Sequence, residues 1–329
     1  MSRSVQGTAQ EACGRKLHAV NKGYYHDPFA TYFATDSTLI NSPLMNRGYW
    51  LRVTAVQNTL HWFSAQQGGR PIQVVSLGSG FDTLFFQWAS QGQSLPYIDD
   101  AAPQLRPLPI VRFVEIDVDE IQKKKQSIIQ ANMLLSSLVA TTSCSGGCEV
   151  YQAISADLRN SEYVVSCLAA VNLCPDIATI IIAECVLVYM EGAESTTLLQ
   201  QLTTRFQTCP STCLVYYDAV HPDDRFGKMM CENLASIGIL LPGIHVFKTP
   251  KDHQVRACDV VGFQQCTSMT MRQVYTLVPK YHMVALNKLE LIDDWDEWNI
   301  VHDHYCLVVA SSNVKSFIEV FPSSNMSKK

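Results

Sequence analysis

The chain has 329 residues, of which 47% are apolar and 17% charged, the balance of an ordinary globular protein rather than a disordered one. A net charge of -5 argues against nucleic acid as the main partner, because no excess of cations is present to neutralise phosphates. The one basic run, residues 123–125, is typical of a solvated helix face.

Membrane and secretory signals are also missing from the sequence. The longest apolar stretch, residues 177–188, is shorter than the ~18 residues of a membrane span and contains Glu184. Residues 1–16 are polar and lack the apolar core of a signal peptide. The 12 cysteines form no CxxC pair, and Cys144 and Cys148 have no histidine nearby. We therefore expect a cytoplasmic protein with reduced thiols and no contact with a membrane.

The chain is expected to form one domain, residues 1–329. Within it, residues 1–70 are expected to be short helices and loops that form a cap over the rest. From Pro71 onward, in the core 71–329, apolar β-branched segments alternate with helical patterns at 121–138 and 194–206. Continuous apolar runs are typical of strands buried on both faces of a parallel sheet. This alternation predicts a doubly wound α/β sheet, with strands at 73–77, 111–116, 150–154, 178–183 and 213–217.

Three further segments complete the predicted organisation. The Pro-rich stretch 92–109 is expected to be an insertion loop. Residues 262–269 and 305–311 are expected to be a closing pair of strands, and antiparallel pairing is one alternative for them. Residues 326–329 are expected to fray.

A glycine-rich turn follows the first predicted strand. Gly78 and Gly80 at the carboxyl end of that strand let the backbone pass close to a ligand, although a plain tight turn would also explain them. Thr83 stands where the dinucleotide fingerprint has its third glycine. A nucleoside without a pyrophosphate is therefore favoured as the ligand, and a dehydrogenase is disfavoured.

Acidic residues follow the next three predicted strands. Asp117 can accept hydrogen bonds from ribose hydroxyls, or can be an exposed strand-end carboxylate. Asp157 with Leu158 can bind an adenine amino group and pack on its ring, or Asp157 can cap a helix. Glu184 lies in an apolar run, where a carboxylate costs free energy unless it is paired or opens onto a cleft. Their common position predicts a ligand site at the carboxyl edge of the sheet.

At this point the sequence resembles the leucine carboxyl methyltransferases. The resemblance extends from about Lys16 to Tyr305, and the segments 46–53 and 183–190 are its specific parts, whereas LGxG is common. The matching segments are GYYHDP (23–28), NRGYWLRV (46–53), LGSGFDT (77–83), VEID (114–117), ADL (156–158), AECVLVYM (183–190) and DRFG (224–227).

The resemblance implies a Rossmann-like class I methyltransferase, with a seven-stranded, mostly parallel sheet, helices on both faces and an N-terminal helical cap. It implies S-adenosylmethionine as cofactor, and as acceptor the C-terminal leucine carboxylate of the protein phosphatase 2A catalytic subunit. A related branch, with longer proteins that end in a β-propeller, modifies a tRNA base; the end of this chain favours the phosphatase branch. Besides Gly80 of the turn, the cofactor-binding residues implied are Lys16, Arg52, Gly78, Asp117, Asp157, Leu158 and Glu184.

A carboxylate acceptor sets modest chemical demands, since it is already a nucleophile at neutral pH and needs no general base. As hypotheses, Arg52 steers a carboxylate and Lys16 supplies a second cation. Tyr189, Tyr216 and Arg225 are candidates for the acceptor pocket, with packing or a structural salt bridge as the alternative for each.

No metal is expected, because the chemistry needs none. His302 and His304 flank an acid and are interpreted as a satisfied strand-edge pair. We expect a monomer. Two rival functions remain open: a carboxyl or hydroxyl methyltransferase of a small molecule, and a non-catalytic regulator that binds the cofactor.

Overall fold

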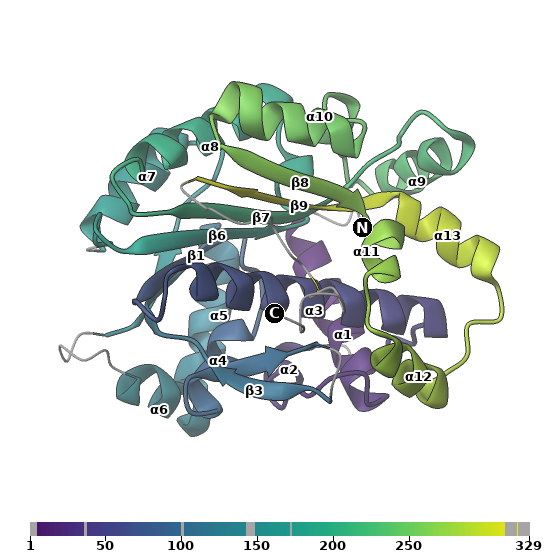
Figure 1. Ribbon diagram of the computed structural model, residues 1–329, viewed down its shortest axis with the longest axis horizontal. Helices are drawn as coiled ribbons and strands as arrows, with labels where there is room; N and C mark the ends of the chain where they lie inside the picture. The colour runs from purple at the N-terminus through teal and green to yellow at the C-terminus, as the bar shows by residue number, and fades with distance from the viewer. Residues whose placement is uncertain are drawn as a thin grey trace, which may run out of the picture.

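The computed structural model describes residues 5–35, 38–99, 102–142, 149–171, 173–312 and 321. The loop at 144–148 and the tail at 326–329 lie outside the described residues. A twisted sheet runs through the middle of the molecule and has helices on both faces (Figure 1).

The main sheet confirms the predicted doubly wound arrangement. Its order is β5-β4-β1-β6-β7-β9-β8; β9 runs antiparallel to its two neighbours and the other pairs are parallel. The predicted closing pair is therefore antiparallel. The chain order reverses between β1 and β6, where such sheets open a crevice for ligands. The strands are β1 (Ile72–Leu77), β4 (Ile110–Asp117), β5 (Tyr151–Ser155), β6 (Ala178–Glu184), β7 (Thr212–Ala219), β8 (Gln265–Thr270) and β9 (Tyr305–Ser311).

The continuous apolar character of the strands follows from burial on both faces. Successive side chains of a strand point to opposite sides, so Val74 packs into one hydrophobic cluster and Val75 into another. The same alternation in β7 sends Tyr216 into the second cluster, while Tyr217 packs against the first.

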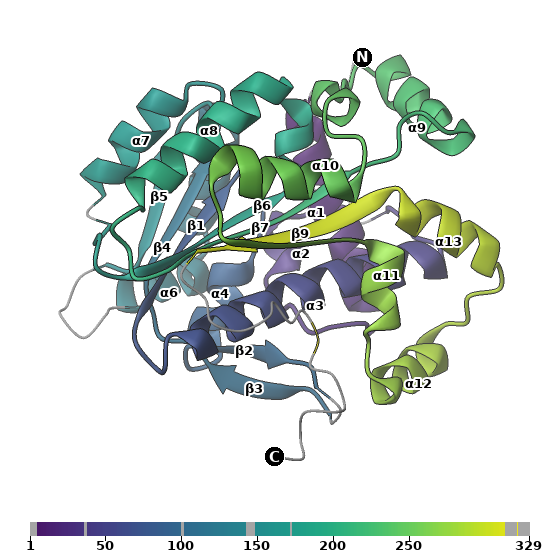
Figure 2. The same cartoon turned by 45° about the horizontal axis from the view of Figure 1, so that its top comes forward.

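The helices form two layers and an edge group, as Figures 1 and 2 show. One face carries α7 (Ser161–Ala170), α8 (Gly192–Arg205) and α10 (Pro250–Val255), followed by the π-helical turn η3 (Arg256–Val261). The other face carries α1 (Val5–Asn21), α2 (Ala30–Phe33), α3 (Pro43–Gln66), α4 (Leu84–Ser90), α5 (Asp119–Ala131) and α6 (Met133–Thr141).

The remaining elements lie toward the β8–β9 edge and the cavity. They are the 3₁₀ turns η1 (Leu187–Tyr189) and η2 (Pro242–His245), and the helices α9 (Arg225–Ser236), α11 (Met271–Thr276), α12 (Lys280–Leu289) and α13 (Trp295–Asp303).

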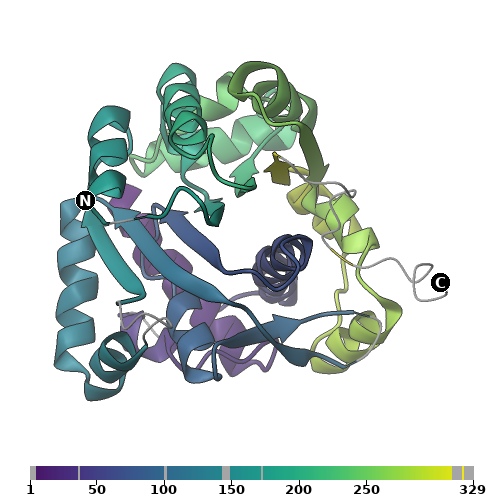
Figure 3. The same cartoon turned by 60° about the vertical axis from the view of Figure 1, so that its left-hand side comes forward.

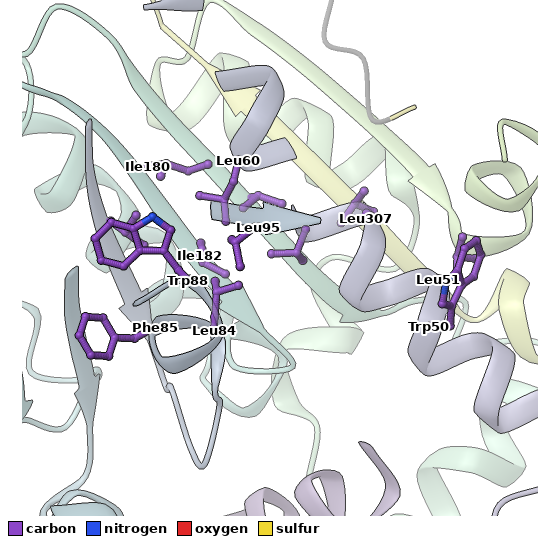
Figure 4. Close-up of a cluster of buried hydrophobic side chains, with 14 of the residues drawn as sticks. Trp50, Leu51, Leu60, Leu84, Phe85, Trp88, Leu95, Ile180, Ile182 and Leu307 are labelled. Carbon is purple, nitrogen blue, oxygen red and sulfur yellow. The ribbon is translucent and has the colours of Figure 1, made fainter. Parts of the chain in front are cut away.

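The first seventy residues differ from the expected short helices. Helix α1 has 17 residues and α3 has 24. Helix α3 begins with Ser42 as N-cap and Pro43 in its first turn, both favoured there. Its apolar residues, such as Leu51 and Leu60, are buried among side chains of the strands (Figure 4). The division into a cap and a core stays our interpretation.

The Pro-rich insertion is a hairpin and not the expected loop. Strands β2 (Ser94–Tyr97) and β3 (Gln104–Pro107) pair antiparallel with each other in a separate sheet. A two-stranded edge ribbon tolerates proline because only one side of each strand needs its amide hydrogens. The hairpin covers α3 on the side away from the main sheet (Figure 3), and the Asn58 side chain bonds both the N–H and the C=O of Ile98.

Two expectations about residues 121–138 were wrong. The single predicted helix is divided at Asn132, whose extended backbone and side-chain bonds to the amides of Leu134 and Leu135 start α6. The basic run is solvated only at Lys123 and Lys124, whereas the side chain of Lys125 is fully buried against Glu115.

Candidate active site

A cavity of about 720 Å³ opens at the carboxyl edge of the sheet, between the strand ends and helices α1 and α3. It collects residues from distant parts of the chain, as the strand-end pattern predicted. Nine of the residues singled out in the sequence line it: Lys16, Arg52, Gly78, Gly80, Asp117, Asp157, Leu158, Glu184 and Tyr189.

The glycine turn closes one wall of the cavity. Gly78 has φ +58° and Gly80 has φ +52°, a left-handed backbone that favours glycine. A Cβ on Gly78 would lie 2.6 Å from Cγ2 of Val186, so the turn is packed directly against the loop that follows β6. Any larger residue at position 78 would push these two walls apart.

Asp117 ends β4 beside this turn. Its carboxylate accepts hydrogen bonds from the N–H of Gly80 and of Val118, both at 2.7 Å. Burial raises the pKa of Asp117, and the two amide bonds oppose that rise. A carboxylate has about four lone-pair positions, so two amide donors leave room for two hydroxyls of a ligand.

Asp157 lies across the cavity and is held by its own neighbour. Arg159 donates to it from Nε at 3.0 Å and from Nη2 at 2.6 Å, and this bonding lowers the pKa of Asp157. The Arg159 backbone N–H also bonds Asp157, at 3.0 Å. Leu158 is buried beside them. Asp157 and Leu158 can therefore present a carboxylate and an apolar surface to a flat ring, the arrangement that the sequence predicts. The contact between Arg159 and Asp157 was not predicted.

Two cations converge on Glu184 at the end of β6. The guanidinium of Arg52 forms an ion pair with Glu184, and Nζ of Lys16 lies 3.9 Å from Oε1 of Glu184 and 2.8 Å from Oδ2 of Asp82. Burial disfavours a charged ammonium, but Asp82 and Glu184 outweigh it and raise the pKa of Lys16. The free-energy cost of a carboxylate in an apolar run is therefore met by pairing.

Aromatic side chains continue the wall beyond Arg52. The guanidinium carbon of Arg52 lies 4.5 Å from the centre of the Tyr217 ring, and Tyr217 stacks on Tyr305 with ring centres 5.2 Å apart. Both tyrosines line the cavity. Glu184 and Tyr217 are register partners on adjacent strands, which places their side chains on the same face of the sheet.

Two of the candidate acceptor residues are not brought to the cavity. Tyr216 is buried on the opposite face of the sheet, with its hydroxyl 2.9 Å from Nδ1 of His253. Arg225 is the exposed first residue of α9 and does not line the cavity. Tyr189 in η1 does line it. A role of Tyr216 or Arg225 in the acceptor pocket has no geometric support, and the residue facing the cavity from β7 is Tyr217.

Sequence reasoning missed several cavity residues besides Tyr217. Asp82 follows the glycine turn directly and could have been found from that position. Arg15, adjacent to Lys16, also lines the cavity and bonds Glu11 and Asn41. Tyr305 gave no sequence signal, because its approach depends on the antiparallel pairing of β9 with β7.

Both histidines have hydrogen-bond partners, but they lie at the end of helix α13 and not at a strand edge. His302 bonds the Trp298 carbonyl at 3.0 Å, and His304 bonds the Ile300 carbonyl and Asp224. Over the described ranges, no group of three or more His, Cys, Asp or Glu side chains is placed to hold a metal. In the same part of the chain no helix is long and apolar enough to cross a membrane, and ten cysteines are free thiols.

The strand order and the ligand cavity at its switch point define a Rossmann-like class I methyltransferase fold. A solved structure from Thermobifida fusca, assigned to the methyltransferases, shares this fold with a TM-score of 0.52 at 12% identity, over 82% of this chain and 83% of that one. The family model for leucine carboxyl methyltransferase matches residues 5–203. The chain belongs to the leucine carboxyl methyltransferase family.

Two relatives show how far the similarity extends. Leucine carboxyl methyltransferase 1 of Caenorhabditis elegans is 31% identical, over 93% of this chain and 91% of its own length. The human tRNA wybutosine-synthesizing protein 4 is 27% identical over 98% of this chain, but the match covers only 46% of that protein.

Proposed function

We propose that this chain transfers a methyl group from S-adenosylmethionine to the α-carboxylate of a C-terminal leucine, and that its acceptor is the tail of the protein phosphatase 2A catalytic subunit. The observation that carries the proposal is the pair of cations, Lys16 and Arg52, beside the glycine turn. Two cations in one cavity suit a site in which carboxylates must be held and aligned.

The cavity residues fit the cofactor. Gly78 has no side chain, so the backbone of the turn can lie close to a ligand. Asp117 has acceptor positions for ribose hydroxyls, and Asp157 with Leu158 suits an adenine ring. Lys16 and Arg52 would hold the carboxylate of its amino-acid part. When bound, S-adenosylmethionine supplies a methyl group on a positively charged sulfur that needs no further activation.

The protein's part on the acceptor side is to orient an anion and to exclude water. Burial raises the pKa of Tyr217 well above its ordinary value and also raises the pKa of Tyr305 and of Tyr189. These phenols therefore stay protonated at neutral pH and can donate hydrogen bonds to a carboxylate. Apolar residues of the lining, such as Leu44, Ile237 and Ile239, can receive a leucine side chain.

No proton needs to be removed from such an acceptor, because a terminal carboxylate is ionised at neutral pH. The contribution expected from these residues is an approach distance of ~3–3.5 Å in line with the leaving group, and a dry environment for the anion. We place the reaction in the cytoplasm and treat the catalyst as a monomer; the ten free thiols of the described residues support a reducing compartment.

The test offers methyl-labelled S-adenosylmethionine with the phosphatase 2A catalytic subunit, intact or lacking its terminal leucine. The expected result is label on the intact subunit alone, released as methanol by mild base because the product is an ester. Label on neither subunit, while the cofactor still binds in a titration, would contradict the phosphatase assignment.

Two parallel samples separate the rival functions. Transfer of label to free small acids would identify a small-molecule methyltransferase, and transfer to tRNA would identify the activity suggested by the longer human relative. Cofactor binding without transfer to any acceptor would indicate a regulator.

A further inference from the structure

Helix α3 contains a glycine in its second turn, where the chain makes no bend. Gly48 lines the cavity, and glycine inside a helix is unfavourable relative to alanine. A packing reason for it is therefore expected. A Cβ on Gly48 would lie 2.7 Å from Nε2 of His302, closer than non-bonded carbon and nitrogen atoms approach each other. The absence of a side chain at Gly48 thus makes room for the imidazole of His302.

The imidazole of His302 is fixed by a second residue of α13. It stacks on the Trp298 indole, with ring centres 3.6 Å apart and ring planes 18° from parallel. Its Nδ1 lies 3.0 Å from the Trp298 carbonyl oxygen, and because that oxygen can only accept a hydrogen bond, Nδ1 carries the proton. Burial lowers the pKa of His302 to about 4, so the ring is neutral at physiological pH. Nε2 is therefore left with a free lone pair.

This lone pair is open to the cavity. Nε2 of His302 has no hydrogen-bond partner among the residues that the structure describes, and it is not one of their fully buried polar atoms without a partner. The whole residue is only 5% exposed and lines the cavity. A buried acceptor atom that is left unpaired costs free energy. An N–H or O–H group of a ligand would remove that cost.

The position of His302 separates it from the cofactor side of the cavity. Tyr305, three residues later, starts β9, which lies three strands from β1 and so about 14 Å across the sheet from the glycine turn. On α3, Gly48 lies one helical turn after Leu44 and one turn before Arg52, and all three line the cavity. Nε2 therefore lies between the apolar wall proposed for a leucine side chain and the charged centre of the cavity.

We propose that His302 sets the specificity for the methyl acceptor, and that its Nε2 accepts a hydrogen bond from the main-chain N–H of the acceptor's terminal residue. The inference rests on the proposed function and deepens it. The hydroxyls of Tyr217 and Tyr305 donate to the terminal carboxylate, while His302 binds the amide that is bonded to the same carbon atom. A neutral imidazole suits this task, because a carboxylate in its place would repel the anion.

The consequence is a preference for the end of a peptide over acids without an amide. A site that hydrogen-bonds an N–H group discriminates against an analogue that lacks it, because a buried polar atom is then left unpaired. Free hydroxy acids and fatty acids carry a carboxylate but no N–H at this position. They should therefore be poor methyl acceptors even where their apolar part fits the cavity.

The first test uses two semisynthetic forms of the phosphatase 2A catalytic subunit, one ending in leucine and one in which an ester oxygen replaces the N–H of that leucine. The wild-type chain should show a kcat/KM about 10-fold lower for the ester form, because an oxygen lone pair then faces Nε2. His302→Phe keeps a ring on Trp298 but has no acceptor atom, so it should methylate the two forms at about equal rates. His302→Gln, whose carbonyl oxygen can replace Nε2, should recover part of the discrimination.

Gly48→Ala tests the same contact from α3. Alanine favours the helix, but its Cβ would displace Nε2 of His302, so this variant should also lose the discrimination between amide and ester. The matched control is His61→Gln, which changes a buried histidine of the same helix that does not line the cavity. The control should discriminate as the wild type does. Wild-type discrimination in both His302→Phe and Gly48→Ala would overturn the proposal.

Cofactor affinity distinguishes this role from a contact with S-adenosylmethionine. His302→Phe should bind S-adenosylhomocysteine as tightly as the wild type in calorimetry, and weaker binding would place the histidine against the cofactor and contradict the proposal. If the wild type methylates the amide and ester forms equally, the role of His302 is refuted and the proposed function stands. If it methylates neither form, the proposed function is refuted, and this inference with it.

Discussion

Two groups of ion-paired side chains meet at Asp82, one facing the cavity and one buried in the core. On the cavity side, Lys16 binds the Asp82 carboxylate and approaches Glu184, and the charged side chains there are 11–23% exposed. On the core side, Lys125 donates to the Asp82 backbone carbonyl at 2.8 Å and pairs with Glu115 at 2.6 Å, with exposures of 0% and 1%.

The two groups differ in whether their cations can exchange an ion-pair partner for a bound ligand. The cavity cations are partly exposed and face a cavity with room for a ligand, so a bound carboxylate can share them. The core pair is fully buried and does not line the cavity. Burial raises the pKa of Glu115, against the opposing effects of Lys125 and Tyr151. A buried pair of this kind contributes little net stability, but the loss of one partner costs much. We infer that the cavity charges serve binding and the core pair holds the glycine turn.

The largest effect is expected from breaking the core pair. Lys125→Met leaves Glu115 buried without its cation, and Oε1 of Glu115 already has no partner. We expect the free energy of unfolding to fall by about 3–5 kcal/mol, measured by urea denaturation at neutral pH. The control is Lys124→Met on the same helix, whose ion pair with Glu120 is exposed. That change should cost no more than about 0.5 kcal/mol, and equal losses would contradict the distinction between the two lysines.

Breaking the cavity group should instead weaken binding. Arg52→Ala removes the partner of Glu184 and the cation over Tyr217. We expect about 1.5–3 kcal/mol less binding free energy for the cofactor or the acceptor, measured by calorimetry and from KM. Stability should fall less than in Lys125→Met, because Glu184 is partly exposed and Lys16 remains near it. Unchanged affinity for both ligands would remove Arg52 from the site.

The smallest effect per pH unit is expected from two buried histidines, one on α3 facing the hairpin and one in the cavity. Burial lowers the pKa of His61, which lies on α3 and faces the hairpin, to about 4, and it lowers the pKa of His302 in the cavity to about 4 as well. Between pH 6.5 and 4 the unfolded chain binds a proton that the folded His61 refuses, so stability falls as the pH falls. The maximum slope is about 1.4 kcal/mol per pH unit for one such group.

His61→Gln should remove this contribution and leave that of His302. The free energy of unfolding of the variant should therefore change less steeply between pH 6.5 and 4, as followed by urea denaturation at a series of pH values. Identical slopes for the two proteins would show that burial does not hold His61 neutral in the folded protein.

Local sequence was enough to locate much of the sheet and several residues that line the cavity. Strands β1, β4, β5, β6 and β7 were found because parallel strands buried on both faces are continuous apolar runs. Gly78, Asp117, Asp157 and Glu184 were found because each lies at or just after the end of a strand, and parallel strands bring their carboxyl ends to one edge. These signals need only a few neighbouring residues.

Tertiary structure alone decided which side each side chain faces and what covers it. Tyr216 and Tyr217 are alike in sequence, and only the register of β7 against β6 shows that Tyr217 shares the face of Glu184. Lys123 and Lys125 belong to one basic run, but packing of α5 buries only the second. Tyr305 reaches the cavity because β9, which is distant from β7 in sequence, is adjacent to it in the sheet. Composition and local pattern determined the elements and their ligand edge, whereas facing and burial depend on contacts between segments far apart in the chain.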